Sequence, residues 1–140
     1  MQHMMRGALA GAAGTTALNT ATFLDMTVRA RPGSTTPPQM VQRAENISGQ
    51  SLGGAEDTAP HRRSGVGSLL AVATGVMTGV AMGRRPPRSP LSPHTTLALG
   101  AGALANAGSV IPMTLLGVTD PRTWSGTSWL SDILPHLAYG

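Results

Sequence analysis

The sequence predicts an all-α protein, a small bundle of transmembrane helices, and three observations support this prediction. Charged residues make up 11% of the 140 positions, against about 25% in a typical soluble domain. Aromatic residues make up only 3%, so the large side chains that fill a water-soluble core are scarce. Three long stretches contain no basic residue, and each has the roughly 20 residues that a helix needs to cross a bilayer.

The composition also argues against intrinsic disorder. A disordered chain is poor in aromatic residues but rich in charge, whereas this chain is poor in both. Its apolar content is mostly Ala, Gly, Val, Leu and Met. Small residues suit helices in lipid, because they let helix backbones approach each other closely. We therefore expect residues 1–140 to form a single membrane domain that is surrounded by the lipid bilayer.

The three expected spans differ in quality. The first covers residues 7–28, contains many Gly and Thr residues, and carries one charge, Asp25, near its end. The second covers residues 65–83 and has no charge. The third covers residues 95–118, also without charge, and is the richest in leucine. The first span is the weakest, and we expect it to depend on its neighbours for stable insertion.

A cleaved signal peptide is the alternative interpretation of the N-terminus. Arg6 would then be the charged region and residues 7–18 the apolar region. The apolar stretch continues to Leu24 and Met26, past any good cleavage site, which favours a retained span.

Two polar segments connect the spans. The long segment 29–63 contains a predicted amphipathic helix over residues 37–48, lying on the membrane surface or over one end of the bundle. Thr36 is its expected N-cap and Gly49 its expected end. The second segment, residues 84–93, contains four prolines and three arginines and predicts a tight polar connection.

The C-terminal region predicts a short amphipathic helix over residues 128–139. Trp124 and Trp129 bracket the end of the third span, as interfacial anchors do. Twelve residues rise only about 18 Å against a hydrocarbon core of about 30 Å. We therefore expect an interfacial or incomplete fourth helix, with Asp132 and His136 near water.

A row of small residues is the most specific pattern in the chain. It lies in the second span, with its members spaced four apart: Gly67, Ala71, Gly75, Gly79 and Gly83. Such a row predicts a face on which another helix packs closely, within the chain or between chains. Gly7 and Gly11 begin a similar row in the first span. The alternative is chance, because a chain with 18 glycines produces such spacings often.

Polar residues inside the expected spans are candidates for function, because they are costly in lipid. Asn19 and Asn106 are uncharged, and an interhelical hydrogen bond is a better interpretation of each than a ligand site. Asp25 and Arg29 are four residues apart, which predicts an ion pair at the end of the first span.

Asp132 and His136 share one helical face, a spacing that suits a metal ligand pair or a proton relay. No third ligand lies within sequence range, since His61 and His94 fall in expected loops. A simple hydrogen-bonded pair is therefore the better interpretation. The sequence contains no cysteine and no recognisable nucleophile–base order, phosphate loop or carboxylate pair. We expect no metal, no cofactor and no enzymatic activity.

The net charge of +4 would suit a nucleic-acid partner, but the placement of the charge does not. All ten basic residues are arginines, and most of them stand at the edges of apolar segments, as in membrane flanks. No aromatic residues are interleaved with them for stacking on bases. Nucleic acid is therefore not an expected partner.

Three stretches together resemble a group of small integral membrane proteins of actinobacteria that have no assigned activity. They are RGALAGAAGTTALN (6–19), RPGSTTPPQ (31–39) and LGVTDPRTWSGTSWLSDILPHLAYG (116–140). The resemblance implies four spanning helices and a location in the inner cell membrane. Members of the group continue past the last stretch into a full apolar helix, and this chain does not.

The leading functional hypothesis is a non-enzymatic accessory or structural membrane component that acts through helix–helix association. A second copy or another membrane protein would be its partner. The alternative is a small transporter or channel subunit, with a polar path lined by Asn19, Asn106, Asp132 and His136.

Overall fold

A computed structural model describes residues 2–84 and 93–140. The described elements are α1 (Gln2–Arg29), α2 (Thr36–Ser48), α3 (Ala59–Arg84), α4 (Pro93–Leu115), the single 3₁₀ turn η1 (Pro121–Thr123) and α5 (Gly126–Tyr139). These residues contain no strand, so the all-α prediction is confirmed. Most of the predicted tight connection at 84–93 lies outside the described residues.

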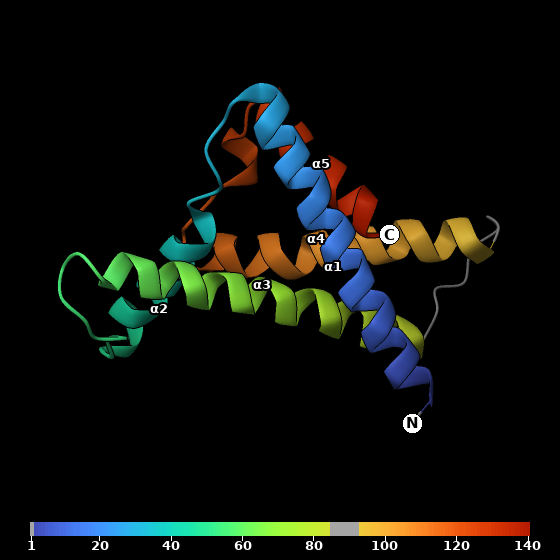
Figure 1. Cartoon of the computed structure of the whole chain (residues 1–140), viewed down its shortest axis with the longest axis horizontal. Coiled ribbons are helices and arrows are strands. Elements are labelled where there is room, and N and C mark those ends of the chain that lie inside the picture. Colours follow the sequence, from blue (N-terminus) through green and yellow to red (C-terminus); the bar gives the residue numbers. More distant parts are fainter. Residues whose placement is uncertain (1, 85–92) are drawn as a thin grey trace.

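The helices form two antiparallel pairs that cross. In Figure 1, α3 and α4 lie side by side, and α1 and α5 form a second pair that crosses them obliquely. The most extensive contact joins α1 to α3, and α2 packs against the first half of α3. The chain therefore has one crossing point where α1, α3 and α5 all meet.

Glycines and caps determine where two of the helices begin and end. The N-cap of α2 is Thr35 rather than the expected Thr36, while Gly49 ends the helix at φ 68° as expected. Helix α4 ends at Leu115, three residues before the predicted end of its span. Gly117 adopts φ 67° there, and the Val118 N–H donates to the Met113 carbonyl at 2.9 Å, which closes the helix.

The remaining helices are longer than the apolar patterns that predicted them. Helix α1 begins at Gln2 rather than residue 7, α3 at Ala59 rather than residue 65, and α5 at Gly126 rather than residue 128. The added turns are mostly polar, so the apolar pattern does not detect them.

The molecule has almost no interior. Its accessible surface is 9199 Å², whereas a compact folded monomer of 14.3 kDa exposes about 6,800 Å². The buried apolar side chains among the described residues are Val41, Ala105 and Tyr139, and no large side chain is fully buried. Leu69 is 70% exposed and Leu115 82% exposed. A surface of this kind needs an apolar environment or a partner.

Two described helices are long and apolar enough to cross a membrane, Ala59–Gly83 in α3 and His94–Leu115 in α4. Only 28% and 17% of their apolar windows are buried, whereas a core helix of a water-soluble protein is mostly buried. Helix α1 has the length, but its composition does not reach the same level of hydropathy. The structure therefore supports two of the three predicted spans.

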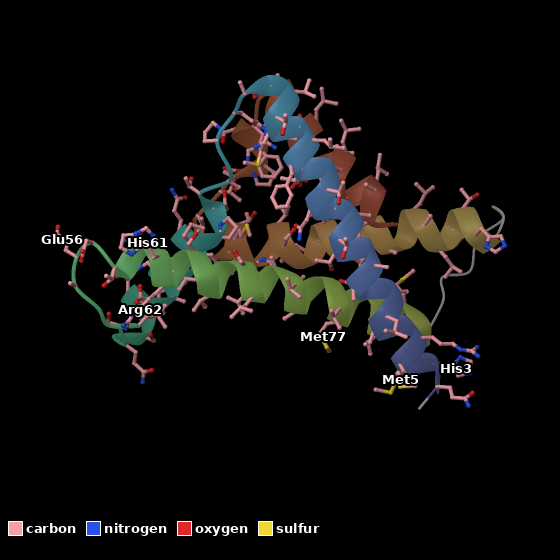
Figure 2. The ribbon with its side chains drawn as sticks, in the orientation of Figure 1. His3, Met5, Glu56, His61, Arg62 and Met77 are labelled. Carbon is pink, nitrogen blue, oxygen red and sulfur yellow. The ribbon has the colours of Figure 1, made fainter. Side chains whose placement is uncertain are left out.

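Polar side chains gather near the ends of α3, and an apolar side chain projects from between them. Glu56, His61 and Arg62 gather around the beginning of α3, and His3 lies near its other end (Figure 2). Met77 projects outward from the second half of α3 and is 62% exposed. An apolar centre between polar ends is the pattern of a helix that crosses a bilayer.

Candidate functional site

The contact between α1 and α3 brings two helix backbones together with almost no side chains between them. A Cβ atom added at Gly79 would lie 2.6 Å from the Gly11 Cα, and one added at Gly11 would lie 2.7 Å from the Gly75 carbonyl oxygen. Gly7 and Gly83 meet at the next turn of the same contact. Neighbouring turns of both helices thus have no room for a side chain.

The five members of the predicted row have three different surroundings. Gly75, Gly79 and Gly83 face α1, whereas Gly67 faces Pro37 of α2, with a hypothetical Cβ 2.9 Å from the Pro37 carbonyl carbon. Ala71 is exposed. The row therefore forms two separate contacts, and both lie within the chain.

Tyr139 closes the crossing point of α1, α3 and α5. It is 7% exposed, and its hydroxyl donates to the Gly75 carbonyl at 2.5 Å. A Cβ atom at Gly14 would lie 2.7 Å from the Tyr139 carbonyl oxygen, so α5 packs tightly against α1 as well. Sequence reasoning missed this residue, because no periodic pattern marks it.

A polar cluster lies between α4 and α5. The Asn106 side-chain amide donates to the Asp132 carboxylate, and its nitrogen lies 3.3 Å from Nδ1 of His136. The Asp132 carboxylate is 3.8 Å from the same ring nitrogen. Ser109 Oγ lies 3.4 Å from Nε2 of His136, on the other side of the ring. Four polar side chains from two helices therefore surround one another.

The cluster is more enclosed than the sequence indicated. The side chains of His136 and Asp132 are only 14% and 20% exposed, so the expectation that both would sit near water is wrong. Gly102 allows this close approach, because a Cβ there would lie 2.5 Å from the His136 carbonyl oxygen. Asn19, the fourth residue of the proposed polar path, is exposed on α1 and has no side-chain hydrogen bond within the described residues.

A second polar group joins the end of α1 to α5. The predicted pair of Asp25 and Arg29 is confirmed, with 2.5 Å between carboxylate and guanidinium. Arg31 contacts the same carboxylate at 2.6 Å. The Arg29 guanidinium also donates to the Ser131 hydroxyl in the first half of α5. The Asp25 carboxylate thus binds both Arg29 and Arg31, and Arg29 also contacts α5.

Charged residues also hold α2 against α3. The Glu45 carboxylate contacts Arg63 at 2.5 Å and accepts from the Leu52 backbone N–H at 2.7 Å. The Leu52 hydrogen bond and the Arg63 guanidinium together lower the pKa of Glu45 below its ordinary value. Arg43 donates to the Leu116 carbonyl at 3.2 Å, which connects α2 to the end of α4.

The two tryptophans pack together where the chain enters α5, with Trp124 just before the helix and Trp129 in its first turn. Their ring centroids are 5.0 Å apart in an edge-to-face arrangement, and Trp124 Nε1 donates to Thr119 Oγ1 at 2.7 Å. Paired amphipathic rings of this kind suit the boundary between lipid and water.

Among residues 2–84 and 93–140, no group of three or more His, Cys, Asp or Glu side chains is placed to hold a metal ion. An open groove of ≈ 480 Å³ between α3 and α4 is lined by apolar residues and two threonines, including Leu70, Met77 and Leu104.

No family model, curated protein or solved structure matches the chain.

Proposed function

We propose that the chain is a multi-pass protein of the inner cell membrane, a non-enzymatic accessory or structural component that acts through helix–helix association. The exposed apolar surface carries this proposal. A monomer that leaves 9199 Å² accessible, and that buries no large side chain fully within the part of the chain that the structure describes, gains little from folding in water. Lipid supplies the apolar surroundings that its own interior does not. The resemblance to small actinobacterial membrane proteins supports the same location.

Helix α1 is the proposed third span. Its 28 residues rise about 42 Å, so it is long enough to cross at an inclination. Five of its threonine hydroxyls donate to the carbonyl four residues earlier: Thr15, Thr16, Thr20, Thr22 and Thr27. Because these hydroxyls are already hydrogen-bonded, they cost less in lipid than their number suggests.

Association with a partner would use the outer face of the bundle. The four glycines of the row in α3 already pack against α1 and α2, so they are not available to a second protein. The groove between α3 and α4 remains uncovered, and Leu70 and Met77 on its α3 side are exposed. A second copy or another membrane protein is the partner that suits this apolar surface.

Two linked measurements test the proposal. Membranes that contain the chain are washed with carbonate at high pH, and we expect the protein to stay in the pellet. Release into the supernatant would contradict membrane integration.

Single cysteines test association through the groove. One is placed at Leu70, on the groove, and the other at Ser51, outside it. We expect crosslinking between chains or to a membrane partner at Leu70 only, and equal yields at the two positions would contradict association through the groove.

Transport remains the second candidate, because three of the four residues of the predicted polar path converge in one cluster. Asn106, Asp132 and His136 lie within hydrogen-bonding range of one another. Flux of ions or small solutes into reconstituted vesicles, abolished by Asn106→Leu and unaffected by Asn19→Leu, would favour this function. Absence of flux in the unaltered chain would remove it.

A further inference from the structure

The outer face of α1 carries a regular row of exposed side chains. Its members recur along the sequence at alternating intervals of four and three residues: Met5, Leu9, Ala12, Thr16, Asn19 and Phe23. All of them are exposed, and Leu9 and Phe23 are 69% and 60% exposed. An alternation of three and four residues is the spacing at which two helices pack along a shared seam. We call this row the α1 seam.

The α1 seam lies on the opposite side of the helix from the rest of the bundle. The glycines of α1 that meet α3 and α5 each stand two residues before a seam member, as Gly7 does before Leu9 and Gly14 before Thr16. Two residues are a little over half a helical turn. In Figure 1, α1 crosses in front of α3, and no other described helix lies over its outer face.

Asn19 is the polar member of the α1 seam that lacks a hydrogen-bond partner. The Thr16 hydroxyl donates to the Ala12 carbonyl at 3.0 Å, so its polar group is already satisfied. The Asn19 amide is exposed and has no side-chain hydrogen bond within the described residues. The seam therefore combines apolar and small side chains with one free amide.

The depth of Asn19 in the proposed span makes this free amide costly. Asn19 stands ten residues before Arg29, at the end of α1, which is about 15 Å along the helix. A hydrocarbon core is about 30 Å thick, so the amide lies near its middle. Water is absent at that depth, and an unpaired amide there favours contact with another polar group.

A second copy of the chain supplies such a group by symmetry. An amide both donates and accepts, so it is its own complement. Copies of one membrane protein share an orientation in the bilayer, and a two-fold axis along the membrane normal then brings two α1 seams together in parallel. In that arrangement Asn19 meets Asn19 of the second copy. The small side chains of Ala12 and Thr16 let the two helices approach closely.

We propose that two copies of the chain associate through the α1 seam, as parallel helices joined by hydrogen bonds between their Asn19 amides. A single asparagine in such a seam fixes the register of the two helices. The inference rests on the proposed membrane location, and it names a second copy as the partner. The α1 seam contains none of the residues that line the groove between α3 and α4, so the groove stays available to another membrane protein.

Energy transfer between labelled copies in lipid vesicles tests the dimer. The sequence has no cysteine, so a cysteine at Ser51 takes one donor or acceptor dye in each chain. We expect transfer above that of random proximity when few chains are present per lipid. Asn19→Leu should weaken association by about 3- to 30-fold. The control Ala10→Leu changes an exposed residue of α1 outside the seam and should leave association unchanged. Equal association of Asn19→Leu and the unaltered chain overturns the proposal.

Disulfide formation tests the seam with Asn19 in place. Single cysteines replace Ala12, on the α1 seam, and Ala10, outside it. Both alanines are exposed and lie two residues apart on the same helix. We expect oxidation in vesicles to give covalent dimers from the cysteine at position 12 and few from the cysteine at position 10. Equal yields at the two positions contradict the seam.

The carbonate wash distinguishes a failure of this inference from a failure of the proposed function. A chain that stays in the pellet but shows no transfer above random proximity overturns the dimer alone. Release into the supernatant overturns the membrane location on which the dimer rests. Dilution in detergent separates the copies, so the stability of a single chain in micelles does not depend on the α1 seam.

Discussion

Two contacts in this molecule bring helices together by opposite means. Between α1 and α3 the glycine backbones touch directly, and the contact contains almost no side chains. Between α4 and α5 the contact is made by a cluster of polar side chains, with Asn106 and His136 at its centre. In lipid, apolar burial gives little drive for helices to associate, so close backbone packing and interhelical hydrogen bonds are the two remaining means. The glycine contact leaves no room for added atoms, whereas the polar contact between α4 and α5 is weakened when any of its hydrogen-bonding side chains is removed.

The largest expected effect comes from adding a side chain to the glycine contact. Gly79→Ile should destabilise the fold by more than about 3 kcal/mol, because the new atoms meet the backbone of α1 and rigid helices must separate. Reversible unfolding in detergent micelles measures this effect. Gly65→Ile is the matched control, since a Cβ at Gly65 meets nothing within 4 Å. Equal losses from the two substitutions would show that the glycine contact does not stabilise the bundle.

Removing the amide from the polar cluster should have a smaller effect. Asn106→Leu is expected to cost about 1–2 kcal/mol, because the Asp132 carboxylate loses its donor. The same unfolding assay applies, with Asn19→Leu as control. Asn19 is exposed and lacks a side-chain hydrogen bond within the described residues, so its replacement should leave stability unchanged. A larger loss from Asn19→Leu than from Asn106→Leu would reverse the assignment of the two asparagines.

The residue that links α5 to the glycine contact should contribute about 1 kcal/mol through its hydroxyl. Tyr139→Phe keeps the ring in place and removes the hydrogen bond to the Gly75 carbonyl. Unfolding of this variant alone and combined with Asn106→Leu measures the coupling between the two contacts. We expect additive losses, since the two contacts involve different residues. Strong coupling would mean that α5 docks as one unit.

The smallest expected effect concerns α2, which neither contact holds. The pKa of Glu45 is lowered in the folded chain from an ordinary value of 4.5. A lowered pKa stabilises the folded state above the ordinary value, and this contribution is lost as the pH falls through the folded-state pKa. Cleavage of the segment 49–58 by an acid-tolerant protease should therefore increase below about pH 4.5. Glu45→Gln should remove that increase.

The sequence predicts the helices well where an apolar pattern exists, and less well at their ends. Gly117 lies inside an apolar run, so its role in ending α4 depends on a positive φ that the pattern does not reveal. The polar first turns of α1 and α3 fall outside the pattern that identified these helices. Helix α2 is the opposite case, because the turn-forming residues Pro37 and Gly49 locate its beginning and its end without a long apolar pattern.

The candidate sites depend on registers that only the fold supplies. The four-residue spacing places Asp132 and His136 on one face, but their contact with Asn106 requires the antiparallel register of α4 and α5. The glycine spacing identifies a packing face without naming its partner, and α1 takes that place at Gly75 and Gly79 only because the helices cross there. The role of Tyr139 follows from the same crossing.

The central claim is that the exposed apolar surface of α3 and α4 faces lipid. Spin labels on single cysteines at Leu69, Leu115 and Ser51 test it directly in reconstituted vesicles. The labels report collisions with oxygen, which dissolves in lipid, and with a water-soluble nickel complex. The account predicts that the labels at Leu69 and Leu115, which lie outside the groove, collide with oxygen and are protected from nickel, whereas the label at Ser51 collides with nickel. Free access of nickel to Leu69 and Leu115 would contradict the account, because these leucines would then face water.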